Sequence, residues 1–424
     1  MGDLDRVWVV DAACAAGFVD DRRWVEYVKA GSTVLVLPTR DRTAAAYWQV
    51  KSGMRFALAV PETPFVPTTI AANPTVARLA DNVLPRLDGS SLGAARLRAY
   101  LLADRIGAVV AARSAGLRWI TVAQRATGAR GAALRGSLVF RVRSALKPLV
   151  ADGEIAVARA PVTLVRATAS RHRRPFVRAW LHFDGKRAHL RVRLATASRA
   201  VTLSGPAGDA EGPSVAINSE GGAAVAFTEW RDHRLLLRVA TSTGGAWRVA
   251  TLDRSGLPIW SQRVAITSDG TVFAAWIDEV GSIRSLRAAV LRAGRRWQRP
   301  ITLDNGDGLG SVALRSASGN IGVAAWHDSL ANEEHVRATV YAGGTWRPST
   351  TLASSLALLD TVTVTRGNAA SVRWRRWENG DASFYRARRR GVVWGKAQMC
   401  AEVADSRLWR PWPTSTSSRL RCPR

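Results

Sequence analysis

Several residue types are scarce in this chain of 424 residues, and each scarcity argues against a class of protein. Only three cysteines occur, Cys14, Cys400 and Cys422, and no Cys-x-x-Cys pair is present, so neither a disulfide framework nor a metal site is expected. Cys400 and Cys422 could still pair in an oxidising compartment. The most apolar segment is broken by Asp104 and Arg105, and the first residues lack the features of a signal peptide. We therefore expect no cofactor, no transmembrane segment and a soluble chain.

Acidic residues are also scarce: 33 Asp and Glu stand against 61 Lys and Arg, which gives a net charge of +28. Such a chain attracts acidic polymers and anionic surfaces. The arginines are spread over both halves without a nucleic-acid motif, so we interpret them as a solvated basic surface and expect no specific nucleic acid partner. No phosphate-binding glycine loop and no Gly-x-Ser-x-Gly elbow occurs.

What the chain does have is a repeat in its C-terminal half, clearest from Gln262 to Leu303. Three kinds of marker recur with one period of about 49 residues, a spacing typical of propeller blades. The aromatic residue that closes the second strand is Trp180, Phe227, Trp276, Trp326 and Trp374 in successive units. The Trp that opens the fourth strand is Trp247, Trp297, Trp346 and Trp394. The Leu that closes the fourth strand is Leu203, Leu252, Leu303 and Leu352.

Each unit reads as four short strands separated by turns such as Asp269-Gly270. One such sheet cannot bury both faces alone, whereas sheets arranged radially can. We predict a mainly β fold, a five-bladed β-propeller with six blades as the alternative, preceded by a small α/β domain. The predicted parts are the α/β domain (1–143), a connector (144–160), the propeller (161–403) and a basic tail rich in Trp, Pro and Ser (404–424). We interpret the recurrent aromatic as packing between sheets rather than as a sugar-stacking platform.

The N-terminal third alternates strands and helices: a helix near 20–31, a strand over 32–38, a helix from Ser90 or Ser91 to Gly107, and strands near 108–112 and 136–142. Its order of elements and its W-Q-x-x-S-G-x-R-F segment resemble the soluble C-terminal domain of bacterial multi-pass membrane glycosyltransferase-like proteins. The residues that match this segment are Trp48, Gln49, Ser52, Gly53, Arg55 and Phe56.

The resemblance implies an association with the cell envelope, but the transmembrane bundle and the acidic catalytic loop of that family are absent from this sequence. No transferase residue is therefore carried over. The candidate binding residues in this part are Trp48, Gln49 and Arg55, although a packing role is favoured for Trp48 and Phe56.

The repeats resemble the blades of sialidase-like or BNR-like propellers, with the turn Ser268-Asp269-Gly270-Thr271 as a shortened Asp-box. Two residues after the second-strand aromatic come Glu229, Asp278 and Asp328, and His327 adjoins the last. These are the candidate catalytic residues, because glycoside hydrolysis requires two carboxylates. The same residues equally suit exposed loops that offset nearby arginines.

Three functions follow as hypotheses. The leading one is a non-catalytic binding module for a glycan or a protein partner at a bacterial cell envelope, which rests on analogy. The first alternative is a propeller glycoside hydrolase of the sialidase-like kind. The second is a soluble fragment or scaffold of a membrane glycosyltransferase system.

Overall fold

The computed structural model describes residues 23–37, 53, 55–58, 92–112, 117–134, 137–143, 145–159, 175–232, 234–243, 245–254, 259–280, 283–317, 319–330, 333–354, 357–364, 369–378, 381–390 and 393–403. The chain divides into two compact units, one of Met1–Glu154 and Leu181–His189, the other of Ile155–Trp180 and Leu190–Arg424. Among the described helices, none has both the length and the apolar character needed to cross a bilayer.

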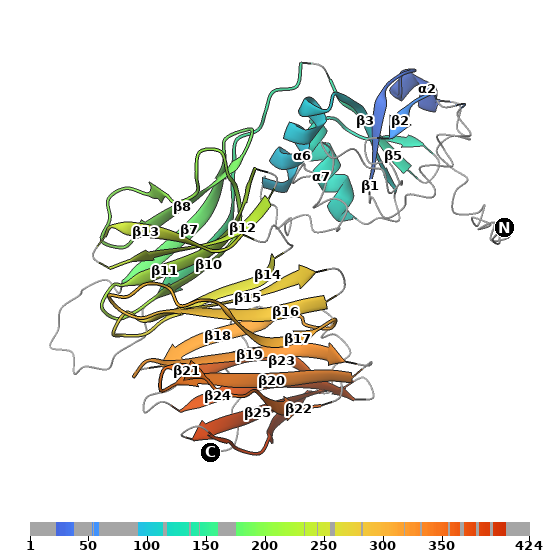
Figure 1. Cartoon of the computed structure of the whole chain (residues 1–424). Coiled ribbons are helices and arrows are strands. Elements are labelled where there is room, and N and C mark those ends of the chain that lie inside the picture. Colours follow the sequence, from blue (N-terminus) through green and yellow to red (C-terminus); the bar gives the residue numbers. More distant parts are fainter. Residues whose placement is uncertain are drawn as a thin grey trace, which may run out of the picture. The chain divides into compact units, whose positions relative to one another are not determined.

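The N-terminal elements form a mixed sheet in the order β2-β1-β3-β5-β4 (Figure 1). Strand β1 runs parallel to β2 and β3, whereas β5 runs antiparallel to β3 and β4. One core contains Leu37, Leu101 and Trp119, and a second contains Trp24 and Val36, so helices cover both faces of the sheet. The elements are α2 (Trp24–Tyr27), β1 (Thr33–Leu37), β2 (Ala57–Leu58), α6 (Leu92–Ala103), β3 (Ile106–Ala112), α7 (Leu117–Thr127), β4 (Ala132–Leu134) and β5 (Ser137–Arg141).

The expected strands and the long helix of this part are confirmed as β1, β3, β5 and α6. The helix expected near 20–31 is only one turn in the described residues, because Val28 is already extended. Helix α7 and strand β4 were not predicted. Helix α7 contains Trp119, Ile120, Thr121 and Val122, which have modest helix propensity, and packing of its buried face against the sheet stabilises it.

Five antiparallel sheets follow, each with the strand sequence of a propeller blade (Figure 1). The fourth strand of the last two sheets is interrupted and therefore counts as two pieces. The EIAVA segment of the expected connector lies in β6. The strands are blade 1, β6 (Ala151–Arg159), β7 (Phe176–Phe183), β8 (Ala188–Leu194) and β9 (Val201–Thr202); blade 2, β10 (Asp209–Ile217), β11 (Ala223–Arg231), β12 (Arg234–Ser242) and β13 (Trp247–Asp253); blade 3, β14 (Ile259–Ile266), β15 (Val272–Val280), β16 (Ile283–Leu291) and β17 (Ile301–Gly306); blade 4, β18 (Val312–Ala317), β19 (Ile321–Leu330), β20 (Glu333–Ala342), β21 (Thr345–Trp346) and β22 (Thr350–Ala353); and blade 5, β23 (Ala357–Val364), β24 (Ala370–Glu378), β25 (Asp381–Arg390), β26 (Val393–Trp394) and β27 (Gln398–Val403).

The turns between the first two strands have the backbone conformation that the sequence predicts. Gly221, Gly270 and Gly319 have φ values of +83°, +86° and +72°, and Asn320 has +59°. Such values are in the left-handed region, which Gly and Asn adopt most readily in hairpins. The first strands β10, β14, β18 and β23 lie next to one another in succession, as in the inner layer of a propeller.

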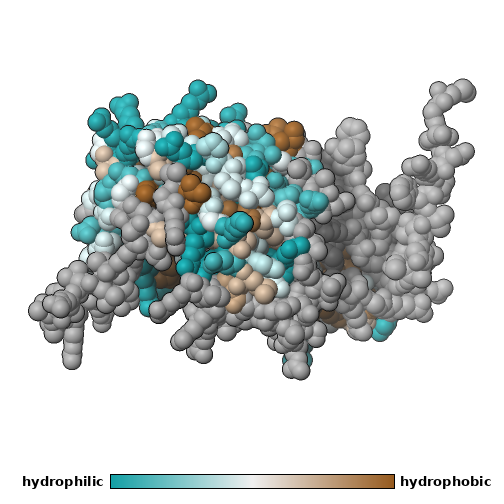
Figure 2. Space-filling model, turned by 90° about the horizontal axis from the view of Figure 1, so that it is seen from below, coloured by the Kyte–Doolittle hydropathy of each residue, from teal (hydrophilic) through white to brown (hydrophobic). Residues whose placement is uncertain are grey.

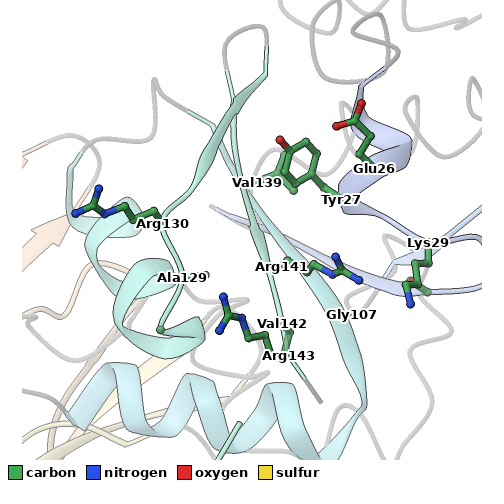
Figure 3. Close-up of a pocket in the computed structure, with 12 residues that line it drawn as sticks. Glu26, Tyr27, Lys29, Gly107, Ala129, Arg130, Val139, Arg141, Val142 and Arg143 are labelled. Atoms are coloured by element: carbon green, nitrogen blue, oxygen red, sulfur yellow. The ribbon is translucent and has the colours of Figure 1, made fainter. Parts of the chain in front are cut away.

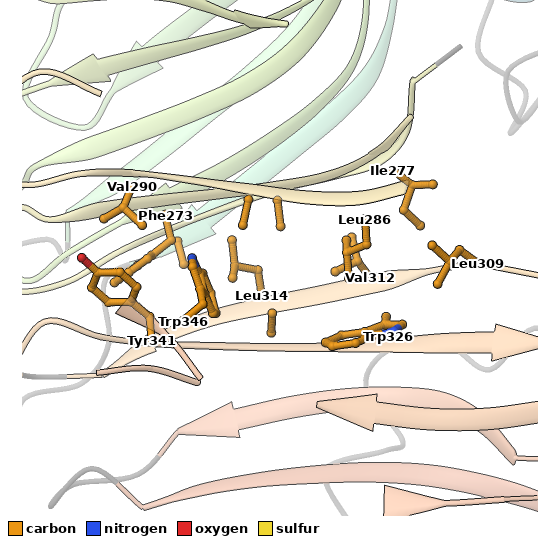
Figure 4. Close-up of a cluster of buried hydrophobic side chains, with 14 residues drawn as sticks. Phe273, Ile277, Leu286, Val290, Leu309, Val312, Leu314, Trp326, Tyr341 and Trp346 are labelled. Carbon is orange, nitrogen blue, oxygen red and sulfur yellow. The ribbon is translucent and has the colours of Figure 1, made fainter. Parts of the chain in front are cut away.

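The second-strand aromatics are packing residues between consecutive blades, as predicted. Phe227, Trp276 and Trp326 are fully buried, and Trp374 is nearly so. Trp276 joins residues of blades 2 and 3, and Trp326 joins residues of blades 3 and 4 (Figure 4). Phe273 and Tyr341 extend the latter layer with ring centroids 5.3 Å apart in an edge-on arrangement.

The outer surface is of ordinary character. On the face shown in Figure 2, described residues are mostly hydrophilic or intermediate, and the strongly hydrophobic ones lie scattered. Single apolar residues are common on the surfaces of folded domains.

We predict that Trp374→Ala lowers the free energy of unfolding by about 3–5 kcal/mol, because it opens a cavity between two sheets. The matched control is Trp180→Ala, which changes the equivalent, half-buried residue of blade 1 and should cost clearly less. Urea unfolding followed by far-UV circular dichroism measures both. Equal losses in the two variants would contradict the packing role.

Candidate functional site

Each of the three candidate carboxylates faces an arginine on the neighbouring strand of its own blade. Arg238 Nη1 lies 2.6 Å from Glu229 Oε2, and Arg287 Nε lies 2.8 Å from Asp278 Oδ2. The Arg287 contact is an ion pair without a directed hydrogen bond, since neither oxygen of Asp278 has a donor aimed at it. Glu229 also accepts a 2.8 Å hydrogen bond from the backbone N–H of Gly205.

A second carboxylate reaches two of these pairs from the preceding blade. Trp326 donates its indole N–H to Asp304 Oδ2 at 2.8 Å, and Trp276 donates to Asp253 Oδ2 at 3.3 Å. Asp304 and Asp253 each follow the closing Leu of a fourth strand. The layers between blades 2 and 3 and between blades 3 and 4 therefore each contain one acid from a second strand and one from the fourth strand of the preceding blade, with a Trp ring beside them.

These layers keep the three candidates apart. Glu229 bonds to Gly205 of blade 1, Asp278 has Asp253 of blade 2 as its acidic neighbour, and Asp328 has Asp304 of blade 3. The equivalent positions of the three acids in their blades left open that they could cluster near one mouth of the ring. In the structure, each has its neighbours in a different pair of blades.

Burial raises the pKa of both Asp278 and Asp328 above the usual carboxyl value. For Asp278, the neighbouring Asp253 raises the pKa further and Arg287 lowers it. For Asp328, Asp304 raises the pKa further, whereas Arg337, His335 and His327 lower it. Each carboxyl is thus biased toward its protonated form beside a second acid.

The layer between blades 3 and 4 contains several titratable groups. Nη1 of Arg337 lies 2.5 Å from Asp304 Oδ2 and 4.0 Å from Asp328 Oδ2, so the two carboxylates are no farther apart than these distances together. His327 is close to Glu334, with an Nε2–Oε2 distance of 3.8 Å. The Asp328 side chain is 8% exposed, whereas that of Asp278 is 1% exposed. We call Asp304, His327, Asp328 and Arg337 the acid cluster.

Two of the candidate binding residues of the N-terminal part, Trp48 and Gln49, lie outside the described residues. Arg55 is exposed, and its carbonyl oxygen accepts a 2.7 Å hydrogen bond from the N–H of Gly31. Phe56 packs in the core edge-on to Trp24, with ring centroids 5.9 Å apart. A packing role for Phe56 is therefore confirmed.

Sequence reasoning missed Asp253, Asp304 and the arginines of the layers. A signal was present, since the tripeptide Thr-Leu-Asp closes both fourth strands and the arginines Arg238, Arg287 and Arg337 recur with nearly the period of the aromatics. No cluster of three metal-ligating side chains occurs in the part of the chain that the structure describes.

Comparisons with known proteins give likenesses in fold only. No protein-family model and no curated protein matches the chain. Solved structures that align include a glycosyl hydrolase from Bacteroides ovatus (12% identity, 50% of this chain and 77% of that one, TM-score 0.27) and the catalytic domain of a GH62 α-L-arabinofuranosidase from Coprinopsis cinerea (10% identity, 44% and 67%, TM-score 0.27). A puromycin-hydrolyzing peptidase from Mycobacterium tuberculosis aligns at 18% identity over 53% of this chain and 37% of its own, with a TM-score of 0.35.

The leading functional hypothesis, a non-catalytic binding module, is contradicted by these comparisons, in which several of the solved structures that align are glycoside hydrolases. Neither the sialidase or BNR assignment nor the glycosyltransferase-like resemblance receives support. At such TM-scores no substrate or site residue can be transferred, so a functional argument has to come from this chain's own side chains.

The raised pKa of Asp278 makes a prediction about stability. Its folded pKa exceeds the unfolded value of about 4, so the stability that it contributes is full below that pH and is lost as the pH rises through the folded pKa. We expect the stability of the wild type to fall relative to Asp278→Asn as the pH increases from about 4 to 7. Urea unfolding at several pH values measures this difference.

Asp184→Asn is the control with the opposite sign. Burial raises the pKa of Asp184, but hydrogen bonds from the N–H groups of Arg187 and Lys186 and from His189 outweigh it and lower the pKa to about 2. Its contribution is present above the unfolded value and is lost as the pH falls toward 2. A wild-type profile parallel to that of Asp278→Asn would contradict the first expectation.

Proposed function

We propose that the chain is a glycoside hydrolase of the propeller type that works through the acid cluster between blades 3 and 4. The observation that supports this proposal is the pair of carboxylates beside one arginine, of which Asp328 has a raised pKa. A glycosidase requires such a pair, one group protonated to act as a general acid and the other ionised.

The roles follow from the surroundings of each carboxylate. Asp304 accepts hydrogen bonds from Arg337 and Trp326, which fix the position of its carboxylate beside Asp328. Asp328 is biased toward the protonated form and would give its proton to the glycosidic oxygen as that bond breaks. Asp304 would bond to the anomeric carbon as the glycosidic bond breaks. Asp328 would then take a proton from water, whose oxygen attacks the anomeric carbon, breaks the bond to Asp304 and releases the sugar. Arg337 Nη1 lies 2.5 Å from Asp304 Oδ2 and 4.0 Å from Asp328 Oδ2, so the two oxygens are no farther apart than the lower end of the range of about 6.5–9.5 Å that inverting enzymes use, and we propose retention.

His327 and Glu229 have lesser places in this proposal. His327 lies beside Asp328 and opposes the rise of its pKa, so it would tune the acid rather than touch the sugar. Glu229 is fully buried and bonded to Arg238 and Gly205, which suits a structural role.

We predict that Asp328→Asn lowers kcat at least about 100-fold on whichever glycoside the wild type hydrolyses, since general acid–base catalysis contributes 10²–10⁴-fold. A panel of aryl glycosides and polysaccharides, assayed for reducing sugar, identifies the substrate. Product anomers followed by nuclear magnetic resonance report retention or inversion.

Asp278→Asn is the matched control, because it removes the same group from the equivalent position of the neighbouring blade, where the enclosure is greater. Its kcat should stay within a few-fold of the wild type. Failure of the wild type to turn over any glycoside, or equal losses in both variants, contradicts the proposal.

The place of action that we propose is outside the cytoplasm, at the cell envelope. Cys400 is disulfide-bonded, to a partner outside the described residues, and disulfides persist mainly in oxidising compartments. The glycosyltransferase-like resemblance of the N-terminal third points to the same surroundings, where a glycan substrate or an anionic surface would be met. A role as a scaffold beside a membrane glycosyltransferase is the further alternative that this resemblance supports.

The disulfide gives a separate prediction. Thiol titration of the denatured, unreduced protein should find one free thiol among its three cysteines. Reduction should lower the free energy of unfolding by about 2–4 kcal/mol, and Cys400→Ser should abolish the effect of the reductant. Three free thiols in protein exported to an oxidising compartment would contradict the assignment.

A further inference from the structure

The α/β part contains a cavity of about 910 Å³ whose lining is strongly basic. Lys29, Arg130, Arg141 and Arg143 contribute four positive charges, and Glu26 contributes one negative charge. Figure 3 shows that these side chains come from three places: the segment of α2, the end of β5 and the loop after α7. Elements far apart in sequence thus bring like charges to one hollow.

The four cations have no counter-ion within the described part of the chain. None of their side chains forms an ion pair or hydrogen bond to another described residue, and all four are exposed. The arginines between the blades differ, since Arg238, Arg287 and Arg337 each meet a carboxylate. Like charges around a cavity repel one another, so an anion that enters gains their combined attraction.

The backbone around the cavity leaves room at one wall, and one nearby set of backbone carbonyls is already hydrogen-bonded. Gly107 has no side chain on the wall of the cavity, where a Cβ would come within 3.1 Å of Ser32 Cβ. The last carbonyls of α7 carry partial negative charge, but Arg98 donates to the carbonyl oxygens of Ala126 and Arg125 at 2.6 and 2.8 Å. The helix end therefore does not repel an anion bound beside the loop that follows it.

The lining also indicates what the anion would carry. Arginine and lysine are the usual phosphate-binding side chains, and guanidinium groups bind phosphate in a bidentate manner. The volume exceeds that of a bare diphosphate, and Tyr27, Val139 and Val142 give an apolar wall for an organic portion. We propose that this cavity binds a soluble organic diphosphate, with Arg141 and Arg143 as its main phosphate contacts. This site is separate from the acid cluster.

Isothermal titration calorimetry with inorganic pyrophosphate and with adenosine diphosphate, at two ionic strengths, tests the proposal on the full chain. We expect the variant Arg141→Gln/Arg143→Gln to bind pyrophosphate at least tenfold more weakly, and Lys29→Gln to show a smaller loss. The organic probe should bind at least threefold more tightly than pyrophosphate.

The matched control is Arg295→Gln/Arg296→Gln, which removes the same two charges from an exposed turn of blade 3 and should change the dissociation constant less than twofold. Equal weakening by both double variants would show general charge attraction and overturn the proposal. Unchanged binding in Arg141→Gln/Arg143→Gln and in Lys29→Gln would do the same. If the double variant is unfolded by circular dichroism, the Lys29→Gln result decides.

Vesicles of phosphatidylcholine with phosphatidic acid distinguish the source of the phosphate. Binding to these vesicles without binding of either soluble probe overturns the soluble diphosphate in favour of a lipid headgroup. Pyrophosphate binding tests this proposal and glycoside hydrolysis tests the glycosidase proposal, so failure of one and failure of the other remain distinguishable.

Discussion

Burial of the second strand of a blade between two neighbouring sheets is the constraint on which the rest of this architecture depends. Strand β15 shows it most fully, because alternate residues enter opposite layers. Val272, Ala274 and Trp276 pack toward blade 2, and Phe273, Ala275 and Ile277 pack toward blade 4. A strand buried on both faces must be nearly continuously apolar, which is why the repeat reads as runs such as VFAAW rather than as simple alternation.

The same burial decides what the polar residues at the end of the strand do. An unpaired carboxylate placed there would lose its hydration, so each second-strand acid has an arginine opposite or beside it on the third strand. A second acid, from the fourth strand of the preceding blade, makes the charges unequal, because two carboxyls then face one arginine. Burial is the main cause of the raised pKa of Asp278 and Asp328, and the second acid, Asp253 or Asp304, raises it further. Structural packing thus places a carboxyl with a raised pKa beside a second carboxyl.

The sequence could predict the packing of the sheets better than the partners of the buried acids. The period and the turn glycines predicted the number, order and packing of the sheets, since Trp276 or Gly270 acts mainly through its own strand or turn. The partners of the acids could not be predicted in the same way. Asp304 and Asp328 belong to different blades, and their proximity depends on how one sheet is placed against the next. In the α/β part, α7 escaped prediction because packing outweighs the propensities of its residues.

The basic character of the chain also has two distinct physical meanings. Arg238, Arg287 and Arg337, which lie between the blades, each face a carboxylate. Arg130, Arg141 and Arg143 around the cavity of the α/β part form no ion pair with another residue that the structure describes. A mutational bias toward arginine would raise the number of arginines between the blades and around the cavity alike. It would not explain why the first group faces carboxylates and the second does not. Since clustering like charges costs free energy unless an anion neutralises them, the basic cavity is the place where the excess charge of this chain has a use that packing does not explain.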